Sequence, residues 1–448
     1  MSIASVQKLQ IFPLNQRSLY SFKDGSPIIN LQIGRQNALI QGKSVYLNFK
    51  LKVLNPQGAT PVNDPGSPKG NDDVFLNSRL GAWSVIDRLT VSEASRNQTI
   101  EGLRDVGRVL AAVRPASVSA LDFNTHLNNK SLSGTRKHVT ATLLANEGID
   151  VSLRLADLSG FLNHGPIPLN QIPLNISIQL APDAQALQVA AVGTDPAERT
   201  EGKTGMTYSL SDVFLSADLL VPDAAMATQL NKQSALEIGF DSYSNIFNVQ
   251  NSSNQTTSLQ LGLSSVKSVF TTVAPPDAQN NFIQDSFTTG EFKASGGTND
   301  AKIDRVSFLR ASMNFPIENE LEVNAQSTAG LPLTPVLKHG LRSVGRWNAR
   351  EVANTLTAPC TQNGGRVTDT MFDGTPFSTV STISQTQPEK LRIYGVDMDS
   401  YSNAGLDFSG VTCGLRVNMD SASAMGLHTT AIARHTVLVK NEAVSVVS

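Results

Sequence analysis

Residue types that carry acid–base or metal chemistry are sparse in this chain. Among 448 residues there are 6 histidines and 2 cysteines. No two histidines have HxH or HExxH spacing, no cysteine and histidine have zinc-site spacing, and no G-x-S-x-G turn occurs. The histidines are His126, His138, His164, His339, His428 and His435. Each is more simply interpreted as a surface or hydrogen-bonded side chain, so we predict no catalytic, cofactor-binding or metal site.

The stretch AERTEGKT (197–204) resembles the end of a phosphate-binding loop. That motif requires glycine where Ala197 stands, a strand before it and a helix after it. A long polar loop precedes it here, so we interpret the stretch as a solvated loop.

Three aspartates lie close together in VDMDSYSNAGLD (396–407), where carboxylates could hold Ca²⁺. They are Asp397, Asp399 and Asp407. Because the stretch lacks the glycine and terminal glutamate of an EF-hand loop, we favour a turn between strands.

A carbohydrate-active enzyme would require two carboxylates on facing strands. Glu237 and Asp241 are candidates, but nothing in their spacing is specific to that chemistry, and the N-terminus shows no export signal. We therefore predict that the chain is not an enzyme.

The two cysteines, Cys360 and Cys413, are too few for a disulfide scaffold. Each is interpreted as a small buried apolar side chain. A bridge between them would require an oxidising compartment and neighbouring Cα atoms, and the sequence decides neither.

Charged residues make up 17% of the chain, against about 25% in an average soluble domain. The surface is therefore neutral and polar, or much of it is covered by other molecules. The formal charge is -2 and no basic block occurs, so we predict no specific nucleic-acid binding. No apolar run approaches the roughly 20 residues of a membrane span, which indicates a soluble chain.

Hydrophobic residues recur with period two in many short segments, which predicts strands with one buried face. In SVYLNFKLKVL (44–54), Val45, Leu47 and Phe49 face one way while Tyr46 and Asn48 face the other. Similar segments are 85–91, 151–155, 174–180, 208–215, 258–263, 267–273, 304–315, 390–396, 413–419 and 435–440. Turn-rich gaps separate them, which favours antiparallel sandwiches over a parallel α/β fold.

Helical patterns are short, at 102–113, 222–230 and around 337–347. The gaps at 55–73, 188–205, 275–300 and 359–378 are long for a compact domain and are interpreted as loop insertions.

The length predicts two or three domains. The best hinge lies within 216–236, between two strand-rich halves. We predict a first sandwich over 25–221, a linker over 222–235 and a second sandwich over 236–448.

Four prolines surround the alternating run LNISIQL (174–180). They are Pro166, Pro168, Pro173 and Pro182. Because proline cannot donate to a strand ladder, we interpret them as the points where strand pairing stops and where an open sheet edge is protected.

The order of these segments resembles the double jelly-roll major capsid protein family of adenoviruses, tailless membrane-containing phages, large DNA viruses, virophages and Polinton-like viruses. The resemblance spans the chain from about residue 25 onward. Its local matches are I-x-x-L-x-V…I-E-G over 86–102, the proline-led strand at 173–180, and SVKSVF at 265–270. The chain lacks the aromatic, basic and proline-rich signatures of the large-virus members, so it is closer to the virophage and Polinton-like branch.

This resemblance implies an all-β fold of two tandem eight-stranded antiparallel jelly-roll sandwiches with long loop insertions and a few short helices. It also implies a homotrimer that mimics a hexagon, tiles an icosahedral double-stranded DNA virus shell and assembles inside the host cell. Neighbouring capsomers and minor capsid and penton proteins would be its partners; contact with an internal membrane stays open. An N-terminal arm over 1–24 would contact a neighbour through Ile11, Phe12 and Tyr20.

The alternative interpretation is a β-sandwich adhesin or receptor-binding spike protein of a virus. Such a protein would be monomeric or fibrous and would bind through an exposed aromatic patch. Only 6% of the residues are aromatic, and one sequence does not locate such a patch.

Overall fold

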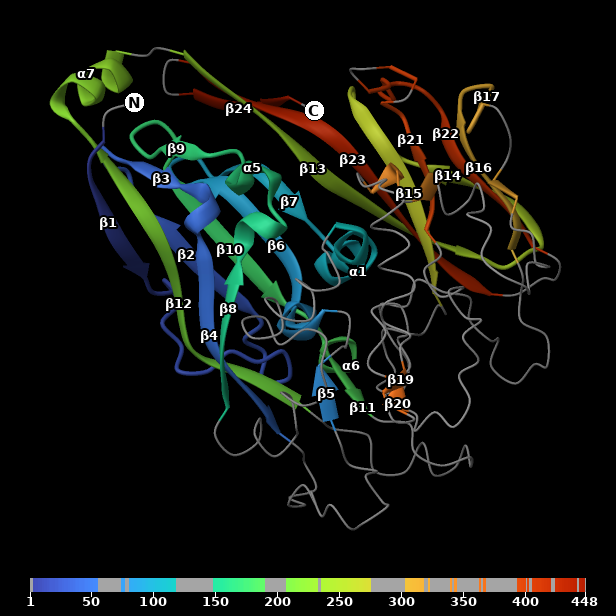
Figure 1. Ribbon diagram of the computed structural model, residues 1–448, viewed down its shortest axis with the longest axis horizontal. Helices are drawn as coiled ribbons and strands as arrows, with labels where there is room; N and C mark the ends of the chain where they lie inside the picture. The colour runs from blue at the N-terminus through green and yellow to red at the C-terminus, as the bar shows by residue number, and fades with distance from the viewer. Residues whose placement is uncertain are drawn as a thin grey trace, which may run out of the picture.

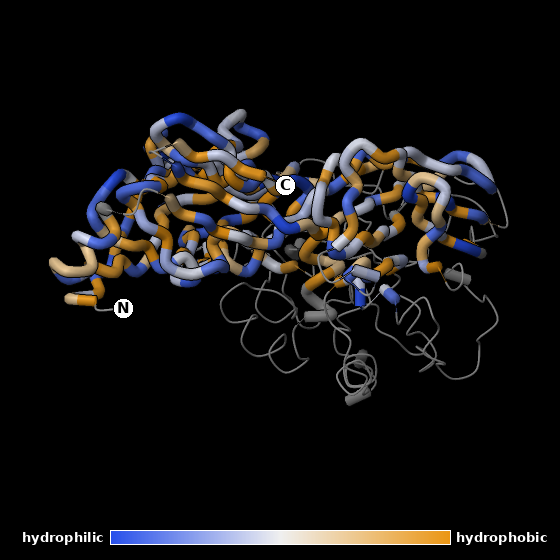
Figure 2. The backbone as a smooth tube through the Cα atoms, turned by 90° about the horizontal axis from the view of Figure 1, so that it is seen from above, coloured by the Kyte–Doolittle hydropathy of each residue, from blue (hydrophilic) through white to orange (hydrophobic). Residues whose placement is uncertain are grey.

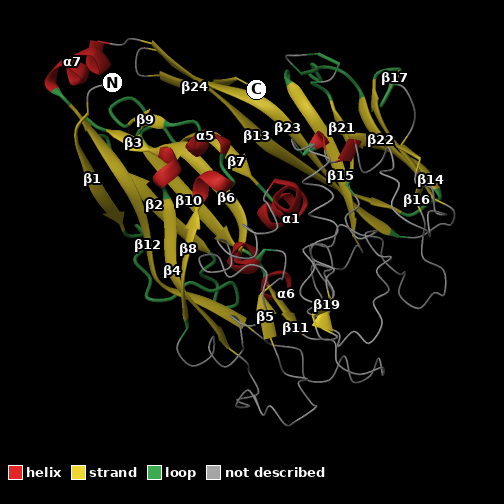
Figure 3. Cartoon of the chain, viewed as in Figure 1, coloured by secondary structure: helices red, strands yellow, loops and turns green. Residues whose placement is uncertain are grey.

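Two β-sandwiches lie side by side in the computed structural model (Figure 1). Strands dominate the fold and the helices are short (Figure 3). Viewed from above, two lobes with apolar segments inside each are joined by continuous chain (Figure 2). The structure describes residues 3–54, 74–76, 80–117, 148–189, 207–232, 235–274, 303–317, 321–322, 339–340, 342–344, 362–363, 366–367, 393–399, 401–402, 405–419, 424–440 and 443–447.

The first sandwich packs two antiparallel sheets face to face. One has the order β8-β4-β12-β3-β9, with β1 added to β12, and the other has the order β2-β10-β6-β7. The strands are β1 (Ile3–Ile11), β2 (Ile28–Ile33), β3 (Leu39–Gln41), β4 (Tyr46–Leu54), β6 (Ile86–Glu93), β7 (Gln98–Leu103), β8 (Ile149–Arg154), β9 (Pro166–Pro168), β10 (Leu174–Leu180) and β12 (Thr207–Pro222). A separate pair joins β5 (Val74–Leu76) to β11 (Leu187–Val189).

The second sandwich repeats this construction. One sheet has the order β13-β23-β15-β21, with β24 added to β23, and the other has the order β14-β22-β16-β17, with β18 added to β16. The strands are β13 (Ala235–Gln250), β14 (Asn254–Leu259), β15 (Val266–Ala274), β16 (Ile303–Arg310), β17 (Met313–Phe315), β18 (Leu321–Glu322), β21 (Tyr394–Asp397), β22 (Cys413–Met419), β23 (Met425–Lys440) and β24 (Ala443–Val447). A short pair joins β19 (Gln362–Asn363) to β20 (Arg366–Val367).

Among the described residues, the two sandwiches share one topology. In each, the first, eighth, third and sixth of the eight matched strands form one sheet, as β1-β12-β4-β8 and as β13-β23-β15-β21. The second, seventh, fourth and fifth form the other, as β2-β10-β6-β7 and as β14-β22-β16-β17. This is the order of a jelly roll, which confirms the predicted fold class.

Part of the segment expected to be an N-terminal arm, Ile3–Ile11, is a strand of the first sandwich. β1 pairs with β12 from Ile3↔Pro222 to Ile11↔Leu215, as β13 pairs with β23 in the second sandwich. We therefore place the start of the first jelly roll at β1. The remaining predicted domain boundaries stay predictions.

The proline-flanked run forms β10, with alternating burial along its length. It is an inner strand, hydrogen-bonded to β2 on one edge and to β6 on the other. The prolines next to it therefore end the strand instead of protecting an open edge, which corrects that part of the interpretation. Pro166 and Pro168 lie in β9, which ends its sheet and does fit the edge-strand role.

The helices occupy connections. They are α1 (Val106–Ser117), α5 (Gly160–Asn163), α6 (Asp183–Ala186) and α7 (Ala224–Lys232), with 3-10 turns η1 (Gly42–Ser44), η2 (Gly81–Val85) and η5 (Leu155–Asp157). α1 begins later than predicted because 102–103 complete β7. The predicted hinge holds the end of β12, then α7, then the start of β13.

Two hydrophobic clusters form the cores, and β13 and β23 contribute to both. Ile238 and Val437 belong to the first cluster, although the strands that carry them lie in a sheet of the second sandwich. Farther along the same strands, Ile246 packs against the second cluster and Leu427 belongs to it. Figure 1 shows both strands running from one sandwich to the other. Apolar burial therefore crosses the predicted domain boundary.

Replacing Ile238 with alanine tests whether β13 supports the first core. The side chain is buried there, so Ile238→Ala should lower the free energy of unfolding by about 2–5 kcal/mol. Hydrogen exchange should show faster exchange of β10 and β6 amides. Ile246→Ala, on the same strand, is the matched control and should chiefly affect β15 and β22. Unchanged protection of β10 in Ile238→Ala would contradict a shared core.

Candidate functional site

The carboxylates considered for catalysis do not face one another. Glu237 and Asp241 lie on one strand, β13, and both are exposed. Their Cα atoms are four steps apart along the strand, a separation of about 13 Å. Asp241 instead forms an ion pair with Lys267 on β15 (2.8 Å). The geometry of paired glycosidase acids is therefore not formed by these two residues.

Two of the three clustered aspartates accept hydrogen bonds within local turns. Asp397 accepts a hydrogen bond from the backbone N–H of Asp399 (3.1 Å), and Asp407 accepts from the backbone N–H (2.8 Å) and hydroxyl (2.6 Å) of Ser409. Those two bonds lower the pKa of Asp407. No group of three metal-ligating side chains occurs within the part of the chain that the structure describes.

Cys413 is a buried free thiol whose pKa is raised by burial, whereas Cys360 and the stretch 197–204 lie outside the described residues. The described helices include none with the length and apolar character needed to cross a membrane.

The three predicted contact residues have different environments. Tyr20 is 1% exposed and belongs to the first core, and its hydroxyl donates to Asn15 Oδ1 (3.1 Å). Ile11 is half-buried against the same core. Phe12 is 60% exposed and lies beside Phe214, with ring centroids 6.2 Å apart. Of the three, Phe12 has the ring that is accessible to a neighbour.

Exposed apolar side chains gather in the N-terminal segment, which we call the N-terminal apolar strip. Its members are Ile3, Val6, Phe12, Leu14, Leu19, Phe22 and Ile28. Two members of the strip, Ile3 and Val6, lie on β1. Among the described strands β1 is hydrogen-bonded only to β12, so the other edge of β1 is open. An open strand edge beside exposed apolar groups is the usual character of a surface that another chain covers.

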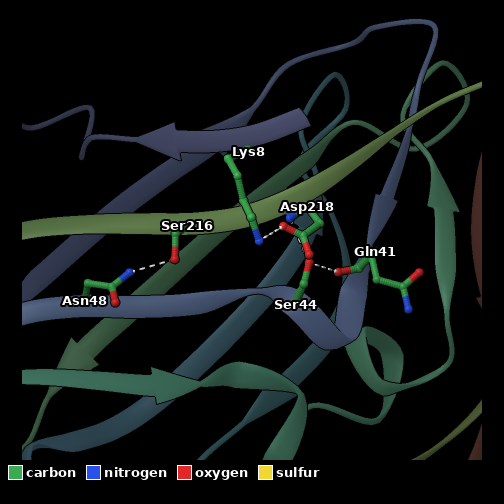
Figure 4. A network of polar contacts seen from close by, with 6 residues as sticks. All are labelled: Lys8, Gln41, Ser44, Asn48, Ser216 and Asp218. Carbon is green, nitrogen blue, oxygen red and sulfur yellow. Dashed lines mark hydrogen bonds and ion pairs between the residues drawn. The ribbon is translucent and has the colours of Figure 1, made fainter. Parts of the chain in front are cut away.

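Polar contacts hold β1 and its neighbours in register (Figure 4). Lys8 Nζ lies 2.6 Å from a carboxylate oxygen of Asp218 on β12. The backbone N–H of Asp218 donates to Ser44 Oγ (2.7 Å), which in turn donates to the carbonyl of Gln41 (2.7 Å). Asn48 Nδ2 donates to Ser216 Oγ (2.9 Å). The exposed Lys8 pair contributes little, but the chain of bonds ties β1, β12 and η1 together.

A buried polar cluster lies where the two sandwiches meet. Glu101 on β7 is 3% exposed. Its Oε1 accepts from Ser242 Oγ on β13 (2.6 Å) and from the N–H of Gly160 (3.1 Å). Its Oε2 accepts from the N–H of Phe161 (3.3 Å) and from the hydroxyl of Ser159. One carboxylate therefore connects β7, the start of α5 and β13.

Burial dominates the electrostatics of this junction. It raises the pKa of Glu101, while hydrogen bonds from the two serine hydroxyls and the two N–H groups act in the opposite direction. Burial, followed by the nearby charges of Glu101 and Asp241, raises the pKa of Tyr243 to about 12.

A second cluster joins α1 to β23. His428 is buried, lies against Phe247 with tilted rings and centroids 4.6 Å apart, and has its pKa lowered to about 2. The first cause is burial and the second is the charge of Arg108 on α1. Beside it, Asn245 Nδ2 donates to the carbonyl of Arg104 (2.5 Å).

Sequence reasoning missed Glu101, Ser242 and His428. The available signal for Glu101 was a charged residue directly after the apolar Ile100, in the stretch that forms β7. Its partners lie 58 to 141 residues away, at Ser159 and Ser242, so no local pattern connects them.

Replacing His428 tests the cost of keeping a neutral imidazole buried. The unfolded chain binds the proton near pH 6.5 and the folded chain only near pH 2, so this stability is present above pH 6.5 and is lost as pH falls. Denaturant titrations between pH 7 and pH 4 should show that His428→Gln loses less stability than the unaltered chain, by about 1.4 kcal/mol per pH unit below pH 6.5. His164→Gln, at an exposed position, is the control. Parallel pH profiles for the unaltered chain and His428→Gln would contradict this.

No family model and no curated protein sequence matches the chain. Solved structures do. The Faustovirus major capsid protein superposes with a TM-score of 0.57 at 8% identity, covering 98% of this chain and 91% of that chain. A chain of the Sputnik virophage cryo-EM structure gives 0.56 at 11% identity, covering 100% and 89%. The capsid protein VP54 of PBCV-1, fitted into a reconstruction of Sputnik, gives 0.55 at 11% identity, covering 99% and 96%. Over the residues that the structure describes, the chain has the fold of these proteins, the double jelly roll.

Proposed function

We propose that the chain is a major capsid protein. Three copies would form a pseudo-hexameric capsomer, and capsomers would tile the icosahedral shell of a double-stranded DNA virus. The protein would then be located in the virion, with neighbouring capsomers and minor capsid and penton proteins as partners.

The observation that carries the proposal is the doubled topology. Two sandwiches of the same strand order lie side by side in one chain. Three such chains around a threefold axis present six similar sandwiches, which is close to the symmetry of a hexagonal tile. A closed ring of this kind uses head-to-tail contacts in which one end of a subunit meets the other end of the next.

The surface supports the same proposal. Charged residues are only 17% of the chain, and the N-terminal apolar strip borders an open strand edge. Interfaces that persist for the life of an assembly are large and poor in charge, often above about 2,000 Å². The likeness to capsid protein structures extends over nearly the whole of this chain and of theirs.

Light scattering and electron microscopy of the purified full chain test the proposal. We expect a stable trimer with a mass three times that of the chain, and particles with hexagonal outlines. A monomer or a fibre at all concentrations would overturn the proposal and favour the adhesin or spike alternative.

Replacing Phe12 with serine tests the N-terminal apolar strip. Because the ring is mostly exposed, Phe12→Ser should change the free energy of unfolding by no more than about 0.5 kcal/mol. It should, however, reduce the yield of capsomers or shells, measured by sedimentation. Val447→Ser, at an exposed apolar position on β24 outside the strip, is the control. Normal assembly of Phe12→Ser would remove Phe12 from the interface.

A further inference from the structure

We propose that Glu101 is a positioning residue that sets the angle between the two sandwiches. Its buried carboxylate, held by hydroxyl and N–H donors from both sides of the junction, fixes β13 against α5. The inference rests on the proposed function in one respect: the angle matters for assembly only if the chain forms a six-sandwich ring.

The position of Ser242 along β13 places it at the junction of the two sandwiches. Ser242 lies between Phe240, which belongs to the first core, and Ile246, which packs against the second. It pairs with Ala433, a member of the second core, while Phe240 pairs with His435. Ser242 therefore marks the point at which the strand passes from one sandwich to the other, and its hydroxyl is bonded to the carboxylate there.

The start of α5 also lies in direct contact with β13. A Cβ at Gly160 would overlap the backbone carbonyl of Asp241, so the first residue of α5 lies directly against β13. One residue later, Phe161 packs edge-on against Phe240 with centroids 5.5 Å apart. The Glu101 carboxylate accepts hydrogen bonds from residues on both sides of this contact. It therefore fixes the contact and also satisfies the polar groups there.

The hydrogen bonds of Glu101 also depend on how the two sandwiches are oriented. The oxygen Oε1 accepts from one donor of each sandwich, Gly160 N–H and Ser242 Oγ. A hydrogen bond to a charged group in a buried site is stronger and more directional than a contact between apolar side chains. Relative rotation of the sandwiches would break one of these bonds and leave a buried charge incompletely paired, which is costly.

Glu93 provides an internal comparison. It is equally buried, at 3% exposed, and accepts two backbone N–H groups, from Ser95 (2.8 Å) and Arg96 (2.7 Å). Both donors lie in the turn between β6 and β7, within one sandwich. A general stabilising role of buried carboxylates applies to Glu93 and Glu101 alike, whereas only Glu101 bridges to β13.

The test uses the full chain with a genetically encoded spin label at Gln32 on β2 and another at Thr256 on β14, both exposed. Labelled chain is diluted into unlabelled chain so that only distances within a subunit are measured. Ser242→Ala removes the bond across the junction and leaves the other three. The matched control is Ser84→Ala, which removes a buried hydroxyl bonded to Gly81 and Ala186 within the first sandwich. Glu93→Gln is the control for Glu101→Gln.

We expect Ser242→Ala to broaden the distance distribution between the labels, and to speed exchange of the Gly160 and Phe161 amides by roughly 10- to 100-fold. Glu101→Gln keeps one acceptor oxygen but replaces the other with an NH2 group that cannot accept from the remaining donors, so its distances should broaden, though less than those of Glu101→Ala. Glu101→Ala should be as broad as Ser242→Ala where it folds. Ser84→Ala and Glu93→Gln should lower the melting temperature without broadening the distances.

Unchanged distances in Ser242→Ala, or equal broadening in Ser84→Ala, would overturn the positioning role. The assembly state separates this result from the proposed function. If the distances broaden as expected but the unaltered chain is a monomer, the junction role stands and the capsid proposal fails. If the unaltered chain forms trimers but the distances do not change, the capsid proposal stands and the junction role fails.

Discussion

The long ladder between β13 and β23 is the interaction on which the arrangement of the chain depends. Sixteen pairs run from Ala235↔Lys440 to Gln250↔Met425 without a register shift. In the matching pair of the first sandwich, β1 and β12, the register shifts between Ile3 and Ser5. A regular antiparallel pair resists local bending where a bulge promotes it. One uninterrupted two-stranded ribbon therefore connects one core to the other.

The ribbon also explains why polar groups are found where the sandwiches meet. A strand that leaves one core and enters another cannot present apolar side chains at the crossing without exposing them or filling a gap. At that point β13 carries Ser242, and β7 brings Glu101 to bond it. Buried polar groups that are fully hydrogen-bonded give a contact geometry that apolar packing alone would leave adjustable. Farther along the same ribbon, His428 of β23 stays neutral beside Arg108 and Phe247.

Strands that the sequence predicted commonly have an environment with two faces. β10 and β4 each have one buried and one partly exposed face, so apolar and polar residues alternate. The first seven residues of β23 are all buried, which removes the alternation, and only 435–440 were predicted. β13 was missed for a related reason: Ser242 occupies a buried position that an apolar residue would normally mark. The arm was mistaken for a separate element because β1 is exposed on both faces while it completes a sheet.

The same reasoning shows which properties depend on distant contacts. Strand existence follows from local pattern, and the jelly-roll order follows from many strands in sequence, but an angle between two sandwiches depends on partners far apart in the chain. Ser159, Gly160 and Ser242 are ordinary residues by any local measure, and they become specific only when one carboxylate joins them. In a ring of identical subunits an error in this angle is repeated in every copy, so the ring closes only if each junction holds the same value. A single internal junction would therefore affect the closure of any ring built from this subunit.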